Sequence, residues 1–286
     1  MYDLSGKVAL VTGTSRKRGL GCGIALRLAQ EGADVIVTGR NKSPIDPWDQ
    51  KEGWRGLDSL VMQIEAMGRS ALAITADISN SREVNAMVEK GVQEFGKIDI
   101  LVNNASIVSG DRSNRAVYNV VDLSEEVWNK AIAVSLTGAF LMCKAVAKHM
   151  IKQGRGGKIV NISSMAGKRG QAGRAWYCAP KFGMLGLTQC LALELGPHNI
   201  NVNAVCPGTM VTWGTRGKAI YEAIGQGLSE EAAIAKVYNS ANQSSALGRP
   251  GTRDEVADVV VFLASNQSDY MTGQAINVCG GQLMAH

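Results

Sequence analysis

Three residues have the types and spacing for acid–base chemistry on an oxygen atom. Tyr177 and Lys181 are four residues apart, so they share one face if this segment is a helix. A tyrosine normally titrates near ~10, and a neighbouring ammonium group lowers that pKa. Tyr177 could then exchange a proton with a carbonyl or alcohol oxygen, to which Ser164, thirteen residues earlier, would hydrogen-bond. A lone tyrosine–lysine pair of this spacing can also be an ordinary surface pair.

A glycine-rich turn follows the first predicted strand, Val8–Thr12. Gly13 comes directly after that strand, and Gly19, Leu20 and Gly21 open the first predicted helix. Glycine lets the backbone turn sharply and approach a pyrophosphate closely, and the helix N-terminus offers free N–H groups. The position of this turn between the first strand and the first helix predicts a dinucleotide site.

The end of the second predicted strand, residues 34–38, bears on the choice of dinucleotide. NAD-binding sites commonly place an acid about 20 residues after the glycine turn, to bind the ribose. Here Gly39 and Arg40 follow the strand. Arg18 lies in the glycine turn, directly after Arg16 and Lys17 in the sequence. Guanidinium groups suit a 2′-phosphate, so the sequence predicts NADP(H), with NAD(H) as the alternative. These basic residues could also be solvated loop charges, and the segment 41–56 could fold over the adenosine end.

Short β-branched runs alternate with helical patterns along the chain. This alternation predicts an α/β fold, a single-domain doubly wound parallel sheet of the Rossmann type over residues 1–286, with helices on both faces. The expected strands are 8–12, 34–38, 71–75, 98–103, 157–162, 199–205 and 275–278, and the expected helices include 21–30, 82–95, 125–152, 177–195 and 252–263.

Two segments look irregular in the sequence. Residues 41–56 contain two prolines and two tryptophans, and residues 207–245 form a long stretch after the sixth strand. Open α/β sheets bind ligands beyond the carboxyl ends of their strands. We therefore expect residues 207–245 to form a substrate-binding loop.

Composition argues against several other classes of protein. The net charge is +5, from 30 basic and 25 acidic residues without long basic runs, so a nucleic-acid partner is not expected. The six cysteines form no C-x-x-C pair and the three histidines are scattered, so no metal site is predicted, and free buried thiols suit a cytoplasmic protein. No signal peptide and no apolar run of about 20 residues is evident, so neither export nor membrane insertion is expected.

Taken in order, the motifs resemble the short-chain dehydrogenase/reductase family from about residue 4 to residue 283. The matching motifs are Thr12-Gly13 with Gly19-Leu20-Gly21, Asn103-Asn104-Ala105, Ser164, Tyr177 with Lys181, Pro207-Gly208 and Thr272-Gly273-Gln274. The resemblance implies an NAD(P)-dependent oxidoreductase that moves a hydride between nicotinamide and a small carbonyl or secondary alcohol. An epimerase or dehydratase of the same superfamily and a non-catalytic nucleotide-binding regulator are the alternatives.

The resemblance also implies residue roles. Tyr177 matches the catalytic acid/base, Lys181 the residue that binds the nicotinamide ribose, and Ser164 the residue that orients the substrate. Asp77 and Ile78 match positions beside the adenine, and Pro207, Gly208 and Thr212 match the nicotinamide side. The other expected cofactor contacts are Gly13, Arg18, Gly19, Leu20, Gly21, Arg40, Asn103, Ala105, Tyr177 and Lys181.

Three positions depart from the family pattern. Five residues, 14–18, lie between Gly13 and Gly19, where the family usually has three. Ser135 stands in the place of an asparagine that supports a water-linked proton relay to the lysine, so we include Ser135 among the candidate catalytic residues. Ser106 stands where glycine is usual.

Substrate contacts are expected around the catalytic residues and in the long segment. The candidates are Ser164, Met165, Arg174, Trp176, Met210 and Trp213. Arg174 could bind a carboxylate, sulfonate or phosphate of the substrate, or it could simply face solvent. The long apolar helices 125–152 and 177–195 could pair across a homotetramer or homodimer interface, or they could pack only on the sheet.

Overall fold

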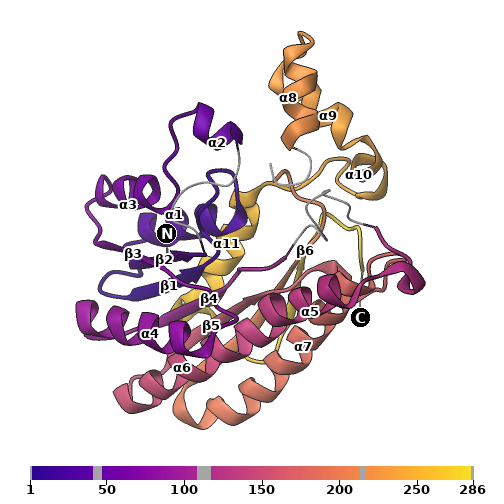
Figure 1. Ribbon diagram of the computed structural model, residues 1–286. Coiled ribbons are helices and arrows are strands. Elements are labelled where there is room, and N and C mark those ends of the chain that lie inside the picture. Colours follow the sequence, from indigo (N-terminus) through magenta and orange to yellow (C-terminus); the bar gives the residue numbers. More distant parts are fainter. Residues whose placement is uncertain (1, 41–46, 108–116, 213–216, 285–286) are drawn as a thin grey trace.

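The structure is a computed structural model that describes residues 2–40, 47–107, 117–212 and 217–284. Seven parallel strands form one sheet in the order β3-β2-β1-β4-β5-β6-β7 (Figure 1). They are β1 (Val8–Thr12), β2 (Asp34–Gly39), β3 (Ala71–Thr75), β4 (Ile100–Asn103), β5 (Gly157–Ile162), β6 (Ile200–Pro207) and β7 (Ala275–Val278). The strand order reverses between β1 and β4, which opens a crevice at the carboxyl ends of these two strands.

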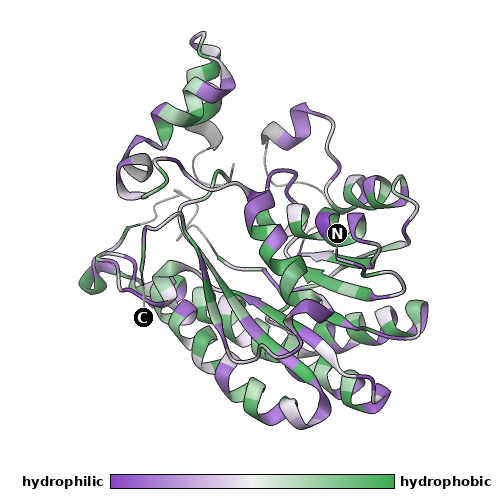
Figure 2. Cartoon of the chain, turned by 180° about the vertical axis from the view of Figure 1, so that it is seen from behind, coloured by the Kyte–Doolittle hydropathy of each residue, from purple (hydrophilic) through white to green (hydrophobic). Residues whose placement is uncertain are grey.

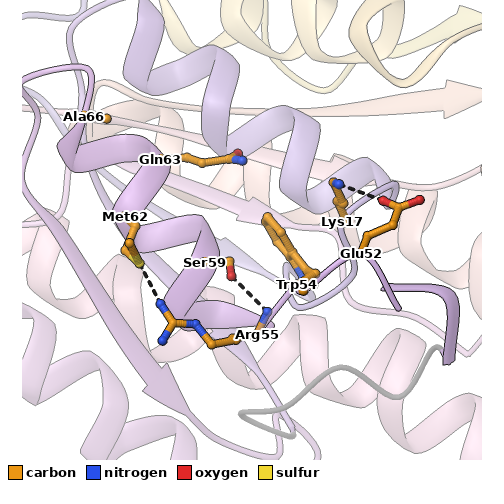
Figure 3. A pocket seen from close by; sticks show the side chains of 9 residues that line it. Lys17, Glu52, Trp54, Arg55, Ser59, Met62, Gln63 and Ala66 are labelled. Carbon is orange, nitrogen blue, oxygen red and sulfur yellow. Dashed lines mark hydrogen bonds and ion pairs between the residues drawn. The ribbon is translucent and has the colours of Figure 1, made fainter. Parts of the chain in front are cut away.

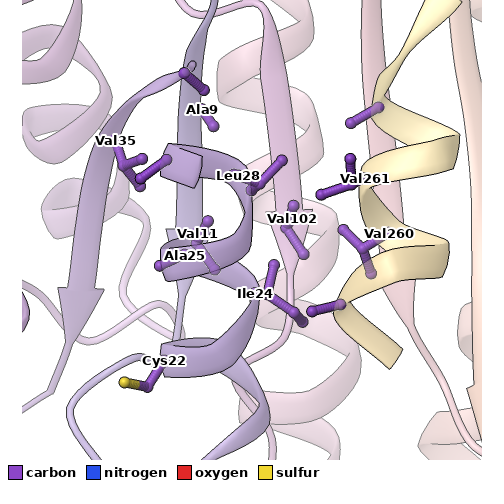
Figure 4. Packing of buried hydrophobic residues seen from close by; sticks show 14 of the residues in the cluster. Ala9, Val11, Cys22, Ile24, Ala25, Leu28, Val35, Val102, Val260 and Val261 are labelled. Atoms are coloured by element: carbon purple, nitrogen blue, oxygen red, sulfur yellow. The ribbon is translucent and has the colours of Figure 1, made fainter. Parts of the chain in front are cut away.

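Helices cover both faces of this sheet, as the alternating pattern predicts. One face carries α1 (Leu20–Gln30), α3 (Leu57–Glu65) and α11 (Arg253–Ala264), and the other carries α4 (Ser81–Phe95), α6 (Gly138–Gln153) and α7 (Ala175–Leu195). Side chains of a strand alternate between faces. Ala9 and Val11 of β1 therefore join the α1 core, where α11 also packs (Figure 4), while Val8 and Leu10 join the core on the other face.

The predicted long helix over residues 125–152 is interrupted. It consists of α5 (Glu125–Ile132), a π-helical turn (Ala133–Thr137) and α6, without a break in the chain's direction. Single π-helical turns are frequent at functional sites because they shift the side chains that follow. Here the turn contains Ser135, which is buried.

The stretch Glu125–Gln153 is apolar and long enough by composition to cross a membrane. Half of its most apolar window is nevertheless buried inside the protein, where Met142, Cys143 and Val146 pack against the sheet. Figure 2 shows hydrophobic residues concentrated in the strands and along one side of the helices around them. This stretch is therefore a core helix of the α/β fold.

Both segments that look irregular in the sequence contain helices. The first holds α2 (Pro47–Lys51), and the second holds α8 (Gly217–Gly225), α9 (Glu230–Val237) and α10 (Asn239–Ser244). The expectation of irregular structure was wrong there because α8 and α9 pack on one another through their own small core, which includes Ile220, Ala223 and Ala233. In Figure 1 these helices stand above the carboxyl end of the sheet.

Candidate active site

Helix α7 begins at Ala175 and presents Tyr177 and Lys181 near its start. Lys181 is almost completely buried, and its Nζ donates a hydrogen bond of 2.8 Å to the carbonyl oxygen of Ile162, the last residue of β5. The same Nζ lies 5.9 Å from the centre of the Tyr177 ring. The predicted helical face is thus observed, with the lysine anchored beneath the tyrosine.

The turn after β5 is locked against α7. The Ser163 hydroxyl donates to the Lys181 carbonyl oxygen at 2.9 Å. A Cβ atom on Gly167 would lie 2.6 Å from that same carbonyl oxygen, so only glycine permits this approach. Ser164 follows directly, is 8% exposed, accepts the N–H of Ala166 at 3.1 Å and is close enough to Tyr177 to lower its pKa. The structure therefore brings Ser164, Tyr177 and Lys181 together, as the sequence predicts.

Electrostatic effects on the two titratable groups differ. Burial raises the pKa of Tyr177, and the hydrogen bond with Ser164 and the positive charge of Arg174 act in the opposite direction. Burial lowers the pKa of Lys181 to about 8. The positive charge of Arg174 thus adds a second cationic neighbour that favours ionisation of Tyr177, beside the Lys181 ammonium near its ring.

Arg174 and Trp176 both contact the Tyr177 ring. The Arg174 guanidinium carbon lies 4.5 Å from the ring centre, and Nη1 donates to Gln171 Oε1 at 2.8 Å. Arg174 Nε is buried and has no hydrogen-bond partner within the described part of the chain. Trp176 is fully buried and meets Tyr177 edge-on at 5.7 Å.

Two of the predicted substrate contacts are buried. Trp176 has no exposed surface and packs edge-on against Tyr177. Met210 is part of the main core and pairs with Gly251 in an isolated bridge. Met165 and Arg174 are partly exposed beside Tyr177, and Trp213 lies outside the described residues.

The glycine turn has the shape of a phosphate cradle. Helix α1 starts at Leu20 with Gly19 as its N-cap, no side chain caps it, and its first turn holds no acid. Its first N–H groups and positive dipole end are therefore available to an anion. Gly13 has a φ of 72°, and a Cβ on it would lie 2.7 Å from the Cα of Ala105. These features fit a dinucleotide pyrophosphate.

The end of β4 holds this cradle in place. Asn104 Nδ2 donates to the carbonyl oxygens of Thr12 and Gly13 at 2.8 and 3.1 Å. A Cβ on Gly21 would lie 2.4 Å from the same Nδ2 atom, so glycine is required there. The Thr12 hydroxyl accepts the N–H groups of Asn104 and Ala105. The Asn104 amide therefore adds side-chain bonds to the backbone pairing of β1 and β4, at the point where the glycine turn begins.

The other predicted cofactor positions border the same crevice in different ways. Asn103 turns its side chain into a buried network, donating to Asn161 Oδ1 at 2.9 Å, so only its backbone is left for a cofactor. Ile78 packs on Gly138, and Asp77 accepts from Ser79. The N–H of Gly208 donates to Val278 O, which ties the end of β6 to β7. Thr212 is partly buried, with its N–H bonded to Met210 O.

The two serine departures meet each other. The hydroxyl oxygens of Ser135 and Ser106 lie 3.0 Å apart, and Ser135 also accepts the N–H of Ile107 at 3.1 Å. In the described chain, Ser135 has no hydrogen bond to Lys181, whose ammonium donates to Ile162. The structure thus gives Ser135 a role in holding the loop after β4.

The basic residues of the glycine turn are paired with an acid that sequence reasoning missed. Glu52 accepts two hydrogen bonds from the Arg18 guanidinium, at 2.7 and 2.9 Å, and one from Lys17 Nζ at 2.7 Å. Arg40 is exposed at the end of β2. The only sequence signal for Glu52 is the extra length of the segment 41–56, which carries no information on where its side chains lie.

Comparisons with known proteins place the whole chain in a family. The Enoyl-(Acyl carrier protein) reductase family matches residues 13–282. The chain is 37% identical to the 2-dehydro-3-deoxy-D-gluconate 5-dehydrogenase of Escherichia coli, over 99% of this chain and 97% of the relative. It is also 37% identical to a 3-oxoacyl-[acyl-carrier-protein] reductase of Thermotoga maritima, over 97% and 98% of the two chains. The structure of carveol dehydrogenase from Mycobacterium avium with NAD matches with a TM-score of 0.83 and 29% identity, over the whole of both chains.

The chain belongs to the short-chain dehydrogenase/reductase family. It is an NAD(P)-dependent oxidoreductase that acts on alcohol or carbonyl groups. The predictions of the fold, the family and the reaction class are confirmed.

Proposed function

We propose that Ser164, Tyr177 and Lys181 carry out the proton transfer that accompanies hydride exchange with a carbonyl or secondary alcohol. The observation that carries this proposal is their convergence: Ser164 is close enough to Tyr177 to lower its pKa, and Lys181 Nζ lies 5.9 Å from the centre of the tyrosine ring. A bound nicotinamide supplies or accepts the hydride. The Ser164 hydroxyl holds the substrate oxygen, and the Tyr177 hydroxyl gives that oxygen a proton in reduction or removes one in oxidation.

Lys181 prepares Tyr177 for this transfer and binds the nicotinamide ribose. Its ammonium is oriented by the Ile162 carbonyl oxygen, which leaves two of its three N–H groups for other acceptors. The cofactor contacts proposed alongside it are Gly13, Arg18, Gly19, Leu20, Gly21, Arg40, Asp77, Ile78, the backbone of Asn103, Ala105, Pro207, Gly208 and Thr212.

For the cofactor, we propose a preference for NADP(H) over NAD(H). No acid follows β2, where a carboxylate would repel a 2′-phosphate, and the exposed Arg40 stands there instead. The preference is expected to be moderate, because Glu52 already occupies the guanidinium of Arg18. Measuring kcat/KM with both cofactors tests it, and a ratio above tenfold in favour of NAD(H) would contradict it.

For the substrate, we propose a small molecule with an anionic group, bound under the segment 207–245. Arg174 carries a buried N–H without a partner in the described chain and flanks Tyr177, so it can bind a carboxylate near the reacting carbon. One relative is named for a gluconate derivative, which agrees with this class.

For the assembly and location, we propose a cytoplasmic homotetramer, with a homodimer as the smaller unit. The proposal is supported by exposed apolar side chains on the outer faces of α6 and α7, among them Phe140, Phe182 and Leu193.

Turnover by the purified protein tests the proposed reaction. A panel of carbonyl and alcohol substrates, with and without a carboxylate, is assayed in both directions with both cofactors. If Arg174→Met lowers turnover of the substrates that carry a carboxylate, the result supports an anionic substrate. Equal loss on neutral substrates would show that Arg174 acts on Tyr177 alone.

A further inference from the structure

The segment 47–56, called the strap below, lies on the glycine turn through two contacts of buried side chains. The Asp49 carboxylate accepts the N–H of Lys17 at 3.0 Å, and the Trp54 indole N–H donates to Ser15 O at 2.8 Å. Asp49 and Trp54 are only 3% and 5% exposed. From α11, Arg253 donates to the carbonyl oxygen of Lys17. The strap and α11 therefore both bind the glycine turn, at the residues that make it longer than usual.

Glu52 gives the strap an electrostatic role. Its carboxylate receives the Arg18 guanidinium through both terminal nitrogens and also receives the Lys17 ammonium. Parallel N–H···O pairs of this kind are how a guanidinium recognises a carboxylate or a phosphate. Glu52 thus occupies the guanidinium fork that a phosphate would otherwise use, and its carboxylate offsets one of the two positive charges of Lys17 and Arg18.

The position of this ion cluster relates it to the adenosine ribose. The N–H and hydroxyl of Thr14 bond to the Thr38 carbonyl oxygen at 3.0 and 3.2 Å, so the turn lies against the end of β2. Arg40 is two residues beyond Thr38. Dinucleotide sites of this type bind the adenosine ribose at the end of the second strand, so its 2′ position would lie near Arg40 and the turn that carries Arg18.

We propose that Glu52 is a determinant of cofactor selectivity that weakens binding of a 2′-phosphate and so shifts the selectivity from NADP(H) toward NAD(H). The inference rests on the proposed cofactor site, but not on which cofactor the protein prefers. The cluster is open to water: a surface pocket of about 450 Å³ lies beside it, lined by Lys17, Glu52, Trp54, Arg55, Ser59 and Met62 among others (Figure 3). Solvent screening keeps such an effect modest, near tenfold rather than thousandfold.

Binding of two nucleotides to the full-length protein tests this role without turnover. The 2′,5′-ADP probe carries the 2′-phosphate and ADP lacks it, and calorimetry gives the Kd of each. Glu52→Gln keeps the shape of the side chain and removes its charge. We expect it to tighten 2′,5′-ADP about tenfold and to change ADP less than twofold, with the gain shrinking at high salt.

Two further variants separate local from general effects. Glu94→Gln, an exposed change on α4 at the other face of the sheet, alters the net charge equally and should leave both Kd values unchanged. Arg18→Met in the Glu52→Gln background should abolish the gain for 2′,5′-ADP. Equal changes for both probes, or no change for 2′,5′-ADP, would overturn the role of Glu52.

The outcome is separable from the proposed preference. If the unaltered protein binds NADH far more tightly than NADPH but Glu52→Gln still shifts the ratio toward 2′,5′-ADP, the NADP(H) preference fails and the role of Glu52 stands. Failure of both ADP and 2′,5′-ADP to bind would overturn the cofactor site itself and the inference with it.

Discussion

At the scale of single residues, Tyr177 is subject to opposing influences. Burial disfavours its phenolate, while the Ser164 hydrogen bond and the Arg174 guanidinium favour it. Lys181 is buried as a cation, and burial lowers its pKa to about 8. Burial thus shifts the pKa of both groups toward their neutral forms. Shifted pKa values are common where side chains carry out proton transfer.

Tyr177→Phe tests the acid/base role directly. The variant keeps the ring and its contacts with Arg174 and Trp176 and removes the transferable proton, so turnover should fall by ~10²-fold or more. Kd for the cofactor should change little, because the ring and its neighbours are retained. Steady-state kinetics and calorimetry on the same preparation check both statements, and turnover close to that of the parent would exclude the assigned role.

Lys181→Met should weaken cofactor binding and turnover but stabilise the fold at neutral pH. The folded pKa of about 8 lies below the ordinary 10.5, so the unfolded chain binds more protons between these values. The buried charge then costs up to about 3 kcal/mol below pH 8, and this cost disappears as pH rises toward 10.5. Loss of the bond to Ile162 offsets part of the gain.

Thermal unfolding at two pH values measures this effect. We expect Tm of Lys181→Met to exceed that of the parent by a few degrees at pH 7, with a smaller difference at pH 10. A Tm that falls at pH 7 would mean that the hydrogen bond to Ile162 outweighs the burial of the charge.

At the scale of elements, the π-helical turn and the loop after β4 form one unit. Ser135 in the turn bonds to Ser106 and to the Ile107 N–H, so the two departures from the family pattern compensate each other. Ser135→Ala should leave the Ile107 N–H without its acceptor and cost about 1–3 kcal/mol. Denaturant unfolding measures that cost, and turnover should slow modestly because the loop borders the cofactor crevice.

We expect Ser135→Asn to be tolerated only if residue 106 is smaller than serine. The Ser106 hydroxyl lies 3.0 Å from that of Ser135, where the longer amide would extend. Ser135→Asn with Ser106→Gly should therefore be more stable than Ser135→Asn alone. Equal unfolding free energies for the two variants would show that the serines are independent.

The sequence predicts elements better than contacts, and the reason is physical. Strands buried on both faces and helices such as α4, whose cap Asn80 and terminal Gly96 are local signals, can be recognised from short stretches. The convergence of Ser164, Tyr177 and Lys181 follows from one strand and one helix. The pairing of Glu52 with Arg18, and of Ser106 with Ser135, joins residues 34 and 29 positions apart through side-chain geometry that no local pattern encodes.

At the scale of the whole molecule, the outer face of α7 suggests how the chain assembles. The helix is apolar nearly all round: Met184 and Ala192 face the core, while Phe182 and Leu193 are 44% and 82% exposed. Gly186 lies between these two on the same exposed stripe, and a residue without a side chain allows another helix to approach closely. Such a stripe suits an isologous contact in which two copies of α7 pack against each other.

Leu193→Glu tests this assembly, because its effect depends on whether the side chain is covered by a second copy. In a lone chain a charge at this exposed position costs little, since surface substitutions usually change stability by less than about 0.5 kcal/mol. Across a two-fold interface it would bury two unpaired carboxylates, which is strongly unfavourable.

Light scattering should therefore give four chains for the parent and a smaller assembly for Leu193→Glu. Met67→Glu, at the end of α3 on the opposite face, should remain tetrameric. A monomeric parent would refute the tetramer, and an intact tetramer in Leu193→Glu would place the interface on another face.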